Sequence, residues 1–382
     1  MVSKTCFAQK KEALAKYVDS IPFVQFTGGV IVFEASIGNS KIPLHFILDT
    51  GSGGVSLDSA TAVELNLTLV PTDTVVSGIA GAHKVSYAFN QKLVTGNIVT
   101  DSLNFYVNDY SILSSVYGEK IDGIIGFGFL HKYIFNINFD SSKIFVYSKG
   151  KFRYEDGGTL FKPTFSKLVY YPLSVKDETK LVSNFYFDTG AGLNLLVTED
   201  FVKDNNFLLG RRKPLITQVQ GLGGKRQMRL TVIKRLKFGP YTFRQVPTNI
   251  YDDEDKVINY PNVVGLLGND IMRRFNITLN YAAQEIHFKP NSNYFDEFDY
   301  AYTGLTLYSF EGKIIVDDIV KDSPASKAGL QNGDELICVN TNFSGNIKAY
   351  DKLLQKVRES IKMIIKRQEK IQIFEIRPLS IR

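Results

Sequence analysis

Two aspartates of this chain end strand-like apolar runs in the same local sequence. Asp49 follows the run 46–48 and begins Asp-Thr-Gly-Ser, and Asp188 follows the run 185–187 and begins Asp-Thr-Gly-Ala. Two carboxylates held close together cannot both ionise at low cost, so one keeps a proton while the other is charged. Such a pair can act as general acid and general base through one water molecule. Two copies of one turn therefore suggest an acid/base pair that shares a proton.

The sequence around each aspartate repeats as well. An Asp-Gly turn after an apolar run is commonly only a hairpin turn, so either copy alone carries little weight. Each copy follows a two-strand pattern and precedes a short helix signal, at 58–64 and 198–201, opened by capping residues. Each half then has two apolar residues before a glycine, at 124–126 and 266–268, and closes on strands near 135 and 275. The repeat predicts a duplicated domain of about 130 residues.

Each half also carries a hairpin tip with glycines: Gly78, Ile79, Ala80 and Gly81 in the first half, and Gly221, Leu222, Gly223 and Gly224 in the second. Together these features resemble the retropepsin and pepsin superfamily of aspartic proteases, over roughly residues 20–290. The resemblance implies a mainly β fold of two pseudo-symmetric, retropepsin-like β-barrel lobes in one chain. It also implies a cleft between the lobes, with the two hairpin tips as flaps.

By this resemblance the two aspartates are the catalytic residues, and the residues that follow them support the site. Thr50 and Thr189 would lock the two turns together through hydrogen bonds between hydroxyl and backbone groups. Gly51 and Gly190 allow the backbone to approach closely where a Cβ would intrude.

The last residue of the motif differs between the halves. Ser52 has a hydroxyl that can donate a hydrogen bond to Asp49, whereas Ala191 has none to donate to Asp188. A hydrogen bond to the charged form lowers a pKa, so we expect Asp188 to hold the shared proton more readily. The first flap also lacks the nearby tyrosine of pepsin-like flaps, for which Tyr87 is a distant candidate.

The stretch after about residue 300 has a different signature. Residues 325–334 read Ala-Ser-Lys-Ala-Gly-Leu-Gln-Asn-Gly-Asp, which resembles a PDZ domain, a β domain with a helix beside a peptide groove. A glycine-led loop can capture a carboxylate, and the edge strand after it can pair with an extended peptide. A C-terminal peptide is therefore the expected ligand of Gly304, Leu305, Thr306 and Leu307. The flanking helix is expected to contain the apolar residues Leu353, Leu354 and Val357.

These patterns divide the chain into an N-terminal segment, two protease lobes, a linker and the PDZ domain, at 1–19, 20–150, 151–290, 291–300 and 301–382. The linker is polar and acidic but contains aromatic residues, which a purely flexible tether would hardly contain. We therefore expect it to lie on the protein surface and to hold the PDZ domain in a fairly fixed position. A role of that domain as a structural cap alone is the alternative to peptide binding.

Composition agrees with these domains and limits the partners. With 382 residues, of which 44% are hydrophobic, the chain can bury two or three cores. Cys6 and Cys338 make no disulfide framework, and no apolar run of about 18 residues could span a membrane. The histidines lack ligand spacing and the acidic run 252–255 lacks the pattern of a calcium loop, so no metal or other cofactor is implied.

The net charge of +6 is partly local, with basic residues at 211–213 and 225–229 around the second hairpin tip. A solvated face is the favoured interpretation, and a cleft rim that selects acidic substrates is the alternative. These cations lack interleaved aromatic residues, so nucleic acid is not an expected partner. Residues 5–10 resemble the end of a bacterial secretory signal, which predicts export to the periplasm or cell envelope. An ordinary N-terminus and a cytoplasmic location are the alternative.

The favoured function is that of a monomeric aspartic endopeptidase, which activates water between Asp49 and Asp188, while the PDZ domain recruits or positions a peptide or protein. The alternative is a non-catalytic peptide-binding protein that retains the protease fold. Two intact Asp-Thr-Gly copies favour the first hypothesis, because a binding protein does not need two close carboxylates and their repulsion. Glycoside hydrolysis by the two carboxylates is disfavoured by the symmetric glycine turns.

Overall fold

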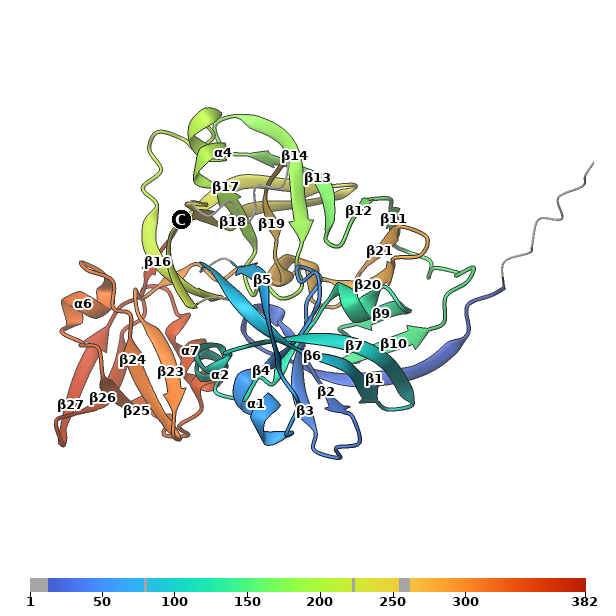
Figure 1. The fold of residues 1–382 in the computed structure, drawn as a ribbon. Coiled ribbons are helices and arrows are strands. Elements are labelled where there is room, and N and C mark those ends of the chain that lie inside the picture. Colours follow the sequence, from blue (N-terminus) through green and yellow to red (C-terminus); the bar gives the residue numbers. More distant parts are fainter. Residues whose placement is uncertain (1–12, 79–80, 222–223, 254–261) are drawn as a thin grey trace, which may run out of the picture.

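The computed structural model describes residues 13–78, 81–221, 224–253 and 262–382, which form two β lobes and a smaller third domain (Figure 1). The first lobe contains η1 (Thr27–Gly29), α1 (Ser59–Glu64), α2 (Ser111–Tyr117), α3 (Phe127–Leu130) and the strands β1 (Tyr17–Gln25), β2 (Ile31–Ile37), β3 (Leu44–Leu48), β4 (Val55–Asp58), β5 (Val70–Gly78), β6 (Gly81–Thr95), β7 (Ile98–Asn108), β8 (Gly123–Ile125), β9 (Ile134–Asn138) and β10 (Lys143–Tyr147).

The second lobe repeats this composition of long strands and short helices. Its elements are β11 (Thr159–Phe161), β12 (Thr164–Phe165), β13 (Val169–Lys176), β14 (Lys180–Phe187), β15 (Leu195–Thr198), α4 (Glu199–Asp204), β16 (Leu215–Gly221), β17 (Gly224–Phe238), β18 (Tyr241–Tyr251), β19 (Val263–Leu267), α5 (Asn269–Met272), β20 (Phe275–Asn280) and β21 (Glu285–Pro290).

The two lobes have the same strand order, which confirms the predicted two-lobed fold. The first lobe runs β1-β2-β3-β8-β4-β7-β6-β5, and the second runs β12-β13-β14-β19-β15-β18-β17-β16. In both lobes the strand that ends at the aspartate pairs in parallel with a later one, β3 with β8 and β14 with β19. Such internal strands are covered on both faces, so residues 46–48 and 185–187 are buried apolar runs without alternation.

A continuous sheet joins the lobes. Strands β11, β21 and β20 follow the first lobe in the chain and extend the sheet of that lobe through β9 and β10 to β1. The pairing between β20 and β9 sets Ile277 opposite Ile137, both fully buried. Strand β1 begins at Tyr17 and pairs with β10, so ordered structure crosses the boundary expected at 19/20.

The predicted helix starts agree with the caps that the structure contains. Asp58 caps α1 by accepting hydrogen bonds from the backbone N–H groups of Ala60 and Thr61. Thr198 caps α4 in the same way, through a bond from the N–H of Phe201. None of the helices in the described part of the chain is long and apolar enough to cross a bilayer.

The third domain has its own buried core around a five-stranded sheet of order β23-β24-β25-β26-β27. Its elements are β22 (Ala301–Tyr302), β23 (Thr306–Phe310), β24 (Lys313–Asp317), α6 (Pro324–Ala328), β25 (Asp334–Val339), α7 (Ile347–Leu354), β26 (Ile361–Arg367), β27 (Lys370–Ile376) and β28 (Leu379–Ser380). Strand β23 therefore lies at one edge of the sheet and β27 at the other. Helix α7 ends at Leu354, so Val357 lies beyond the helix in which it was expected.

The connection to this domain is packed against the second lobe, as expected from its aromatic residues. Tyr294 packs on Phe275, and the ring of Phe298 lies under the guanidinium of Arg274 at 4.3 Å. Asp296 pairs with Arg273, with Oδ2 to Nη1 at 2.7 Å. These contacts hold the linker on the surface of the second lobe.

Candidate active site

The two Asp-Thr-Gly turns interlock through their threonines. The Thr50 N–H donates to Thr189 Oγ1 at 3.0 Å, and the Thr189 N–H donates to Thr50 Oγ1 at 3.1 Å. Each hydroxyl also donates across the lobe interface, from Thr50 to the Phe187 carbonyl at 2.6 Å and from Thr189 to the Leu48 carbonyl at 2.8 Å. Both threonines are buried, so these four bonds form in a site without competing solvent.

The glycines of the two motifs bring each turn against the opposite carboxylate. A Cβ placed on Gly51 would lie 2.6 Å from the carboxyl carbon of Asp188. A Cβ on Gly190 would lie 2.5 Å from the carboxyl carbon of Asp49. Any larger residue would therefore displace a carboxylate, which explains why glycine occupies both positions.

Burial and mutual repulsion set the charge state of the two carboxyl groups. The pKa of Asp49 is raised well above its usual range, first by burial and then by the charge of Asp188. Burial also raises the pKa of Asp188, while hydrogen bonds from Asp49 and from the backbone of Gly190 and Ala191 oppose the rise. The pair can therefore hold one proton at a pH where ordinary carboxylates have lost theirs.

The expectation that Asp188 holds the proton more readily is wrong in its premise. The Ser52 hydroxyl forms its hydrogen bond with Tyr106 Oη, at 3.4 Å, rather than with Asp49. The glycine N–H groups serve the two carboxylates alike, with Gly51 N to Asp49 Oδ1 at 2.7 Å and Gly190 N to Asp188 Oδ1 at 2.9 Å, and the Ala191 N–H also donates to Asp188 Oδ1 at 3.1 Å. The pKa values of both aspartates are raised, and the Ser52 hydroxyl takes no part in lowering that of Asp49, so the difference between Ser52 and Ala191 gives no ground for favouring Asp188.

Two tyrosines behind the first motif were not predicted from the sequence. Tyr106 bonds to Ser52, and four residues later Tyr110 Oη bonds to Ser56 Oγ at 2.6 Å. The two bonds have the same sequence separation because β4 and β7 pair in parallel, with Ser56 beside Tyr106. In the sequence, the equal spacing of Ser52 from Ser56 and of Tyr106 from Tyr110 was the signal that could have revealed these bonds. That spacing can be interpreted only when the parallel pairing of β4 with β7 is known.

Two further tyrosines lie close enough to sense the charge of the carboxylates. Burial raises the pKa of Tyr117, and the charges of Asp49 and Asp188 raise it further. Burial and the charge of Asp49 raise the pKa of Tyr281, whose hydroxyl has no hydrogen-bond partner among the described residues. These groups belong to α2 and to the turn after β20, and no local motif marks either one.

The predicted flaps correspond to the hairpins β5–β6 and β16–β17. Gly78 pairs with Gly81 in the first hairpin, and Gly221 pairs with Gly224 in the second. The tip residues Ile79, Ala80, Leu222 and Gly223 lie outside the described residues. Tyr87, the distant flap candidate, stacks on Phe89 at 5.3 Å in the body of β6.

The predicted peptide-binding residues of the third domain lie at the start of its edge strand β23. Gly304 is in the left-handed region (φ 70°), and a Cβ there would lie 2.2 Å from the Cβ of Ser323. Leu307 is buried in the core of the domain, and Leu305 packs partly against that core. Thr306 begins the strand, with Asp317 of β24 opposite it.

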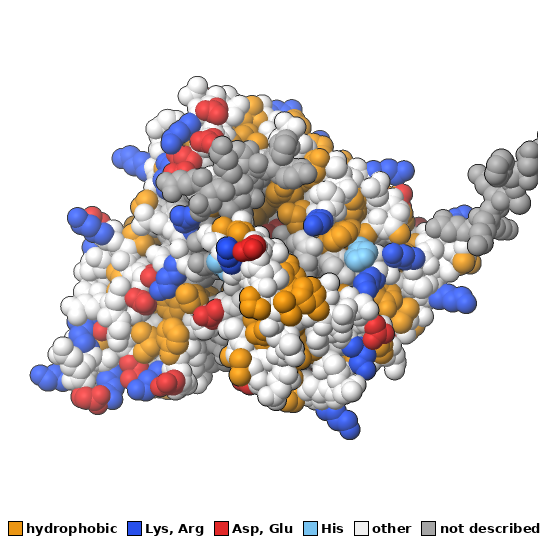
Figure 2. Space-filling model, viewed as in Figure 1, with side chains coloured by type: hydrophobic (Ala, Val, Ile, Leu, Met, Phe, Trp, Pro, Cys, Tyr) orange, Lys and Arg blue, Asp and Glu red, His pale blue; other side chains and the backbone are white. Residues whose placement is uncertain are grey.

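The basic residues around the second hairpin have local partners. Ion pairs join Arg212 to Asp177, Arg229 to Glu199 and Lys225 to Asp318. On the face drawn in Figure 2, Lys and Arg side chains are scattered among Asp and Glu side chains and do not gather in one patch. These three paired cations therefore do not act as a free positive rim of the cleft.

Comparison with known families agrees with this geometry. A family model described as aspartyl protease matches residues 33–129 and 172–271, which contain both Asp-Thr-Gly turns and more than half of the chain. A PDZ domain model matches residues 315–367, within the third domain. No curated protein matches the chain. The chain belongs to the aspartyl protease family and carries a PDZ domain after its two lobes.

Proposed function

We propose that this protein is an aspartic endopeptidase that hydrolyses peptide bonds by water activation between Asp49 and Asp188. The observation that carries the proposal is the reciprocal threonine lock, which holds two carboxyl groups together, each of them accepting a hydrogen bond from the glycine N–H of its own turn. The raised pKa of both groups supports a shared proton in the resting site.

In this reaction the charged carboxylate accepts a proton from the water as its oxygen attacks the peptide carbonyl carbon. The protonated carboxyl group donates its proton to the carbonyl oxygen, which gives a neutral tetrahedral intermediate. The first group then passes the proton to the amide nitrogen, the C–N bond breaks, and a carboxylic acid and an amine leave. The proton removed from the intermediate returns to the pair, so both residues regain their starting states.

A role in peptide binding alone is less consistent with the site. Burying two acidic groups in contact costs free energy, because the low dielectric strengthens their repulsion and removes hydration. A groove that only binds peptides has no use for this arrangement. A proton-transfer site requires it, because the two pKa values must differ.

Cleavage of a mixed peptide library at several pH values tests the proposal. The wild type should cleave the library, and Asp49→Asn and Asp188→Asn should each lose about a thousandfold or more of the rate, since general acid–base contributions alone reach 10²–10⁴. Equal turnover by the wild type and by the double variant, which carries both Asp49→Asn and Asp188→Asn, would refute the proposal. The PDZ domain is expected to recruit or position a peptide or protein in this reaction.

A further inference from the structure

The groove of the PDZ domain, between the edge strand β23 and helix α7, faces the first lobe. Among the described residues β23 pairs only with β24, so its other edge has no strand partner and is the edge to which an extended peptide could add. Helix α2 of the first lobe contacts β23, and both lie beside α7 in Figure 1. The groove therefore has a neighbour within the same chain.

The residue after α2 lies between the two walls of this groove. Gly118 caps α2 in the left-handed region (φ 68°). A Cβ on Gly118 would lie 2.6 Å from Cγ2 of Ile347, in the first turn of α7, and 3.6 Å from Cβ of Ser309, in β23. Only a residue without a side chain fits here, which places the backbone of the first lobe in the groove itself.

Charge and cation–π contacts hold this segment in place. Lys348 of α7 pairs with Glu119 at 2.6 Å, and its ammonium group lies 3.7 Å from the ring centroid of Phe26. The ring of Phe26 in turn packs on the ring of Tyr117, with 5.0 Å between the two centroids. The charges of Asp49 and Asp188 contribute to the raised pKa of Tyr117. The occupied groove is thus linked through one aromatic pair to the dyad.

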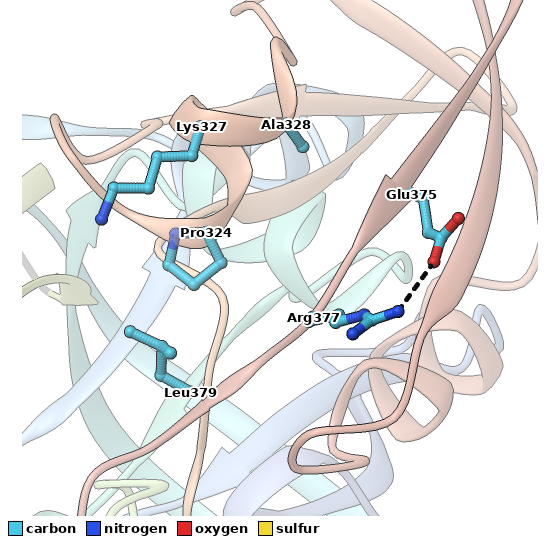
Figure 3. A pocket seen from close by; sticks show the side chains of 6 residues that line it. All are labelled: Pro324, Lys327, Ala328, Glu375, Arg377 and Leu379. Atoms are coloured by element: carbon cyan, nitrogen blue, oxygen red, sulfur yellow. Dashed lines mark ion pairs between the residues drawn. The ribbon is translucent and has the colours of Figure 1, made fainter.

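Little free space remains at this end of the groove. A cavity of about 90 Å³ is lined by the segment 117–119 on one side and by β23 and the start of α7 on the other. A larger cavity of about 320 Å³ lies at the opposite edge of the sheet, between Pro324 of α6 and Leu379 (Figure 3). A peptide cannot lie along the whole of β23 unless the first lobe withdraws.

The second lobe contacts the same strand. Gln220 of β16 donates to Tyr308 Oη of β23 at 2.7 Å. Lys225 of β17 lies over the Tyr308 ring at 4.4 Å and pairs with Asp318 at 2.9 Å. The edge strand of the PDZ domain is therefore clamped between α2 and the flap hairpin of the second lobe.

We propose that the PDZ groove takes segment 117–119 of its own first lobe as its resting ligand, and that an extended peptide with a free C-terminal carboxylate competes for this place. Binding of such a peptide withdraws α2 from β23 and moves Tyr117 relative to the dyad. The proposal deepens the proposed peptide-recruiting role of the PDZ domain. Its tests measure docking and binding rather than hydrolysis, so they can fail while the protease proposal stands.

Crosslinking tests the resting state. In the full chain with Cys6→Ser, the pair Glu119→Cys and Lys348→Cys is treated with bis-maleimidoethane. The ion pair of Glu155 and Lys289 has nearly the same length, 2.7 Å against 2.6 Å, and similar exposure, so cysteines at these two positions form a matched positive control. Docking predicts equal yields for the two pairs. A yield for the pair 119/348 no higher than that of the mismatched pair 119/289 would overturn the proposal.

Peptide binding tests the competition, in the Asp49→Asn background so that the probe stays intact. The probe is a fluorescein-labelled pool of random heptapeptides with free C-termini, and its amidated form is the control. Glu119→Lys should tighten binding of the free-carboxylate pool about threefold to tenfold, and adding Lys348→Glu should reverse the gain. Glu155→Lys should change nothing. Equal binding by the wild type and Glu119→Lys, or no preference for the free carboxylate, would overturn the competition.

Discussion

Replacing Thr50 by valine removes one hydroxyl from the threonine lock with little change in shape. The variant leaves two groups without partners, the N–H of Thr189 and the carbonyl of Phe187. A buried polar group that loses its partner costs about 1–3 kcal/mol. Thr50→Val should therefore lower the free energy of unfolding by about 2–6 kcal/mol, a large part of the 5–15 kcal/mol typical of a folded protein.

Urea titration at constant pH measures this loss, and Thr100→Val is the matched control. Thr100 is buried in β7, and its hydroxyl has no hydrogen-bond partner among the described residues. Its replacement by valine should be neutral or stabilising, because it removes an unpaired polar atom. Thr189→Val should cost as much as Thr50→Val, since its hydroxyl makes the mirror-related pair of bonds.

Catalysis gives a second measure of the same variant. Thr50→Ser keeps the hydroxyl and loses only a methyl group, worth about 1 kcal/mol, so it should retain activity. Thr50→Val should lose activity under conditions where it is still folded, because the two turns are no longer held in register. The reasoning fails if Thr50→Val is no more destabilising than Thr100→Val.

Three further outcomes are expected. Gly190→Ala should lower kcat about a hundredfold or more, because the new Cβ would lie 2.5 Å from the carboxyl carbon of Asp49 and would displace that carboxyl group. A displacement of about 1 Å can cost a factor of that size. Gly210 has no atom within 4 Å of the position of a Cβ, so Gly210→Ala should leave kcat unchanged in the same assay. Because the pKa of Asp49 is raised by folding, its contribution to stability is fully present below its usual pKa of about 3.9 and is lost as the pH rises through the raised value. The urea midpoint should therefore fall between pH 4 and 7 more steeply in the wild type than in Asp49→Asn, and parallel curves would contradict this assignment. Arg212→Met leaves the fully buried carboxylate of Asp177 without its cation, so the free energy of unfolding should fall by about 3–5 kcal/mol in thermal or urea denaturation. The neighbouring Arg211 is exposed, so Arg211→Met should lower the free energy of unfolding by less than about 0.5 kcal/mol.

Much of the fold could be predicted because the information is local and duplicated. Apolar runs, caps and turn glycines recur in both halves, and the structure gives both lobes one strand order. The joining of β20 to β9 could not be predicted in this way. It pairs residues of the two halves of the chain, and buried strands of similar composition have many acceptable neighbours.

In the candidate site, too, some features could be predicted from local sequence and others depend on residues distant in the chain. The type and position of Asp49 and Asp188 follow from the repeated motif, because each turn sets its own carboxylate with its own backbone donors. The direction of the Ser52 hydroxyl does not follow, because Tyr106 reaches it only through the parallel pairing of β4 and β7. The motif alone therefore suggested a hydroxyl donor for Asp49 that the structure directs to Tyr106 instead.

Residue types and their spacing are sufficient to predict two matched turns that present two carboxylates, and a PDZ domain after them, since both depend on short runs of residues. What surrounds these elements became visible only in the folded molecule. The partner of Ser52, the contact of Gly118 with Ile347 and the clamp on Tyr308 join residues distant in the chain. Such contacts depend on how whole domains pack, and no local pattern encodes them.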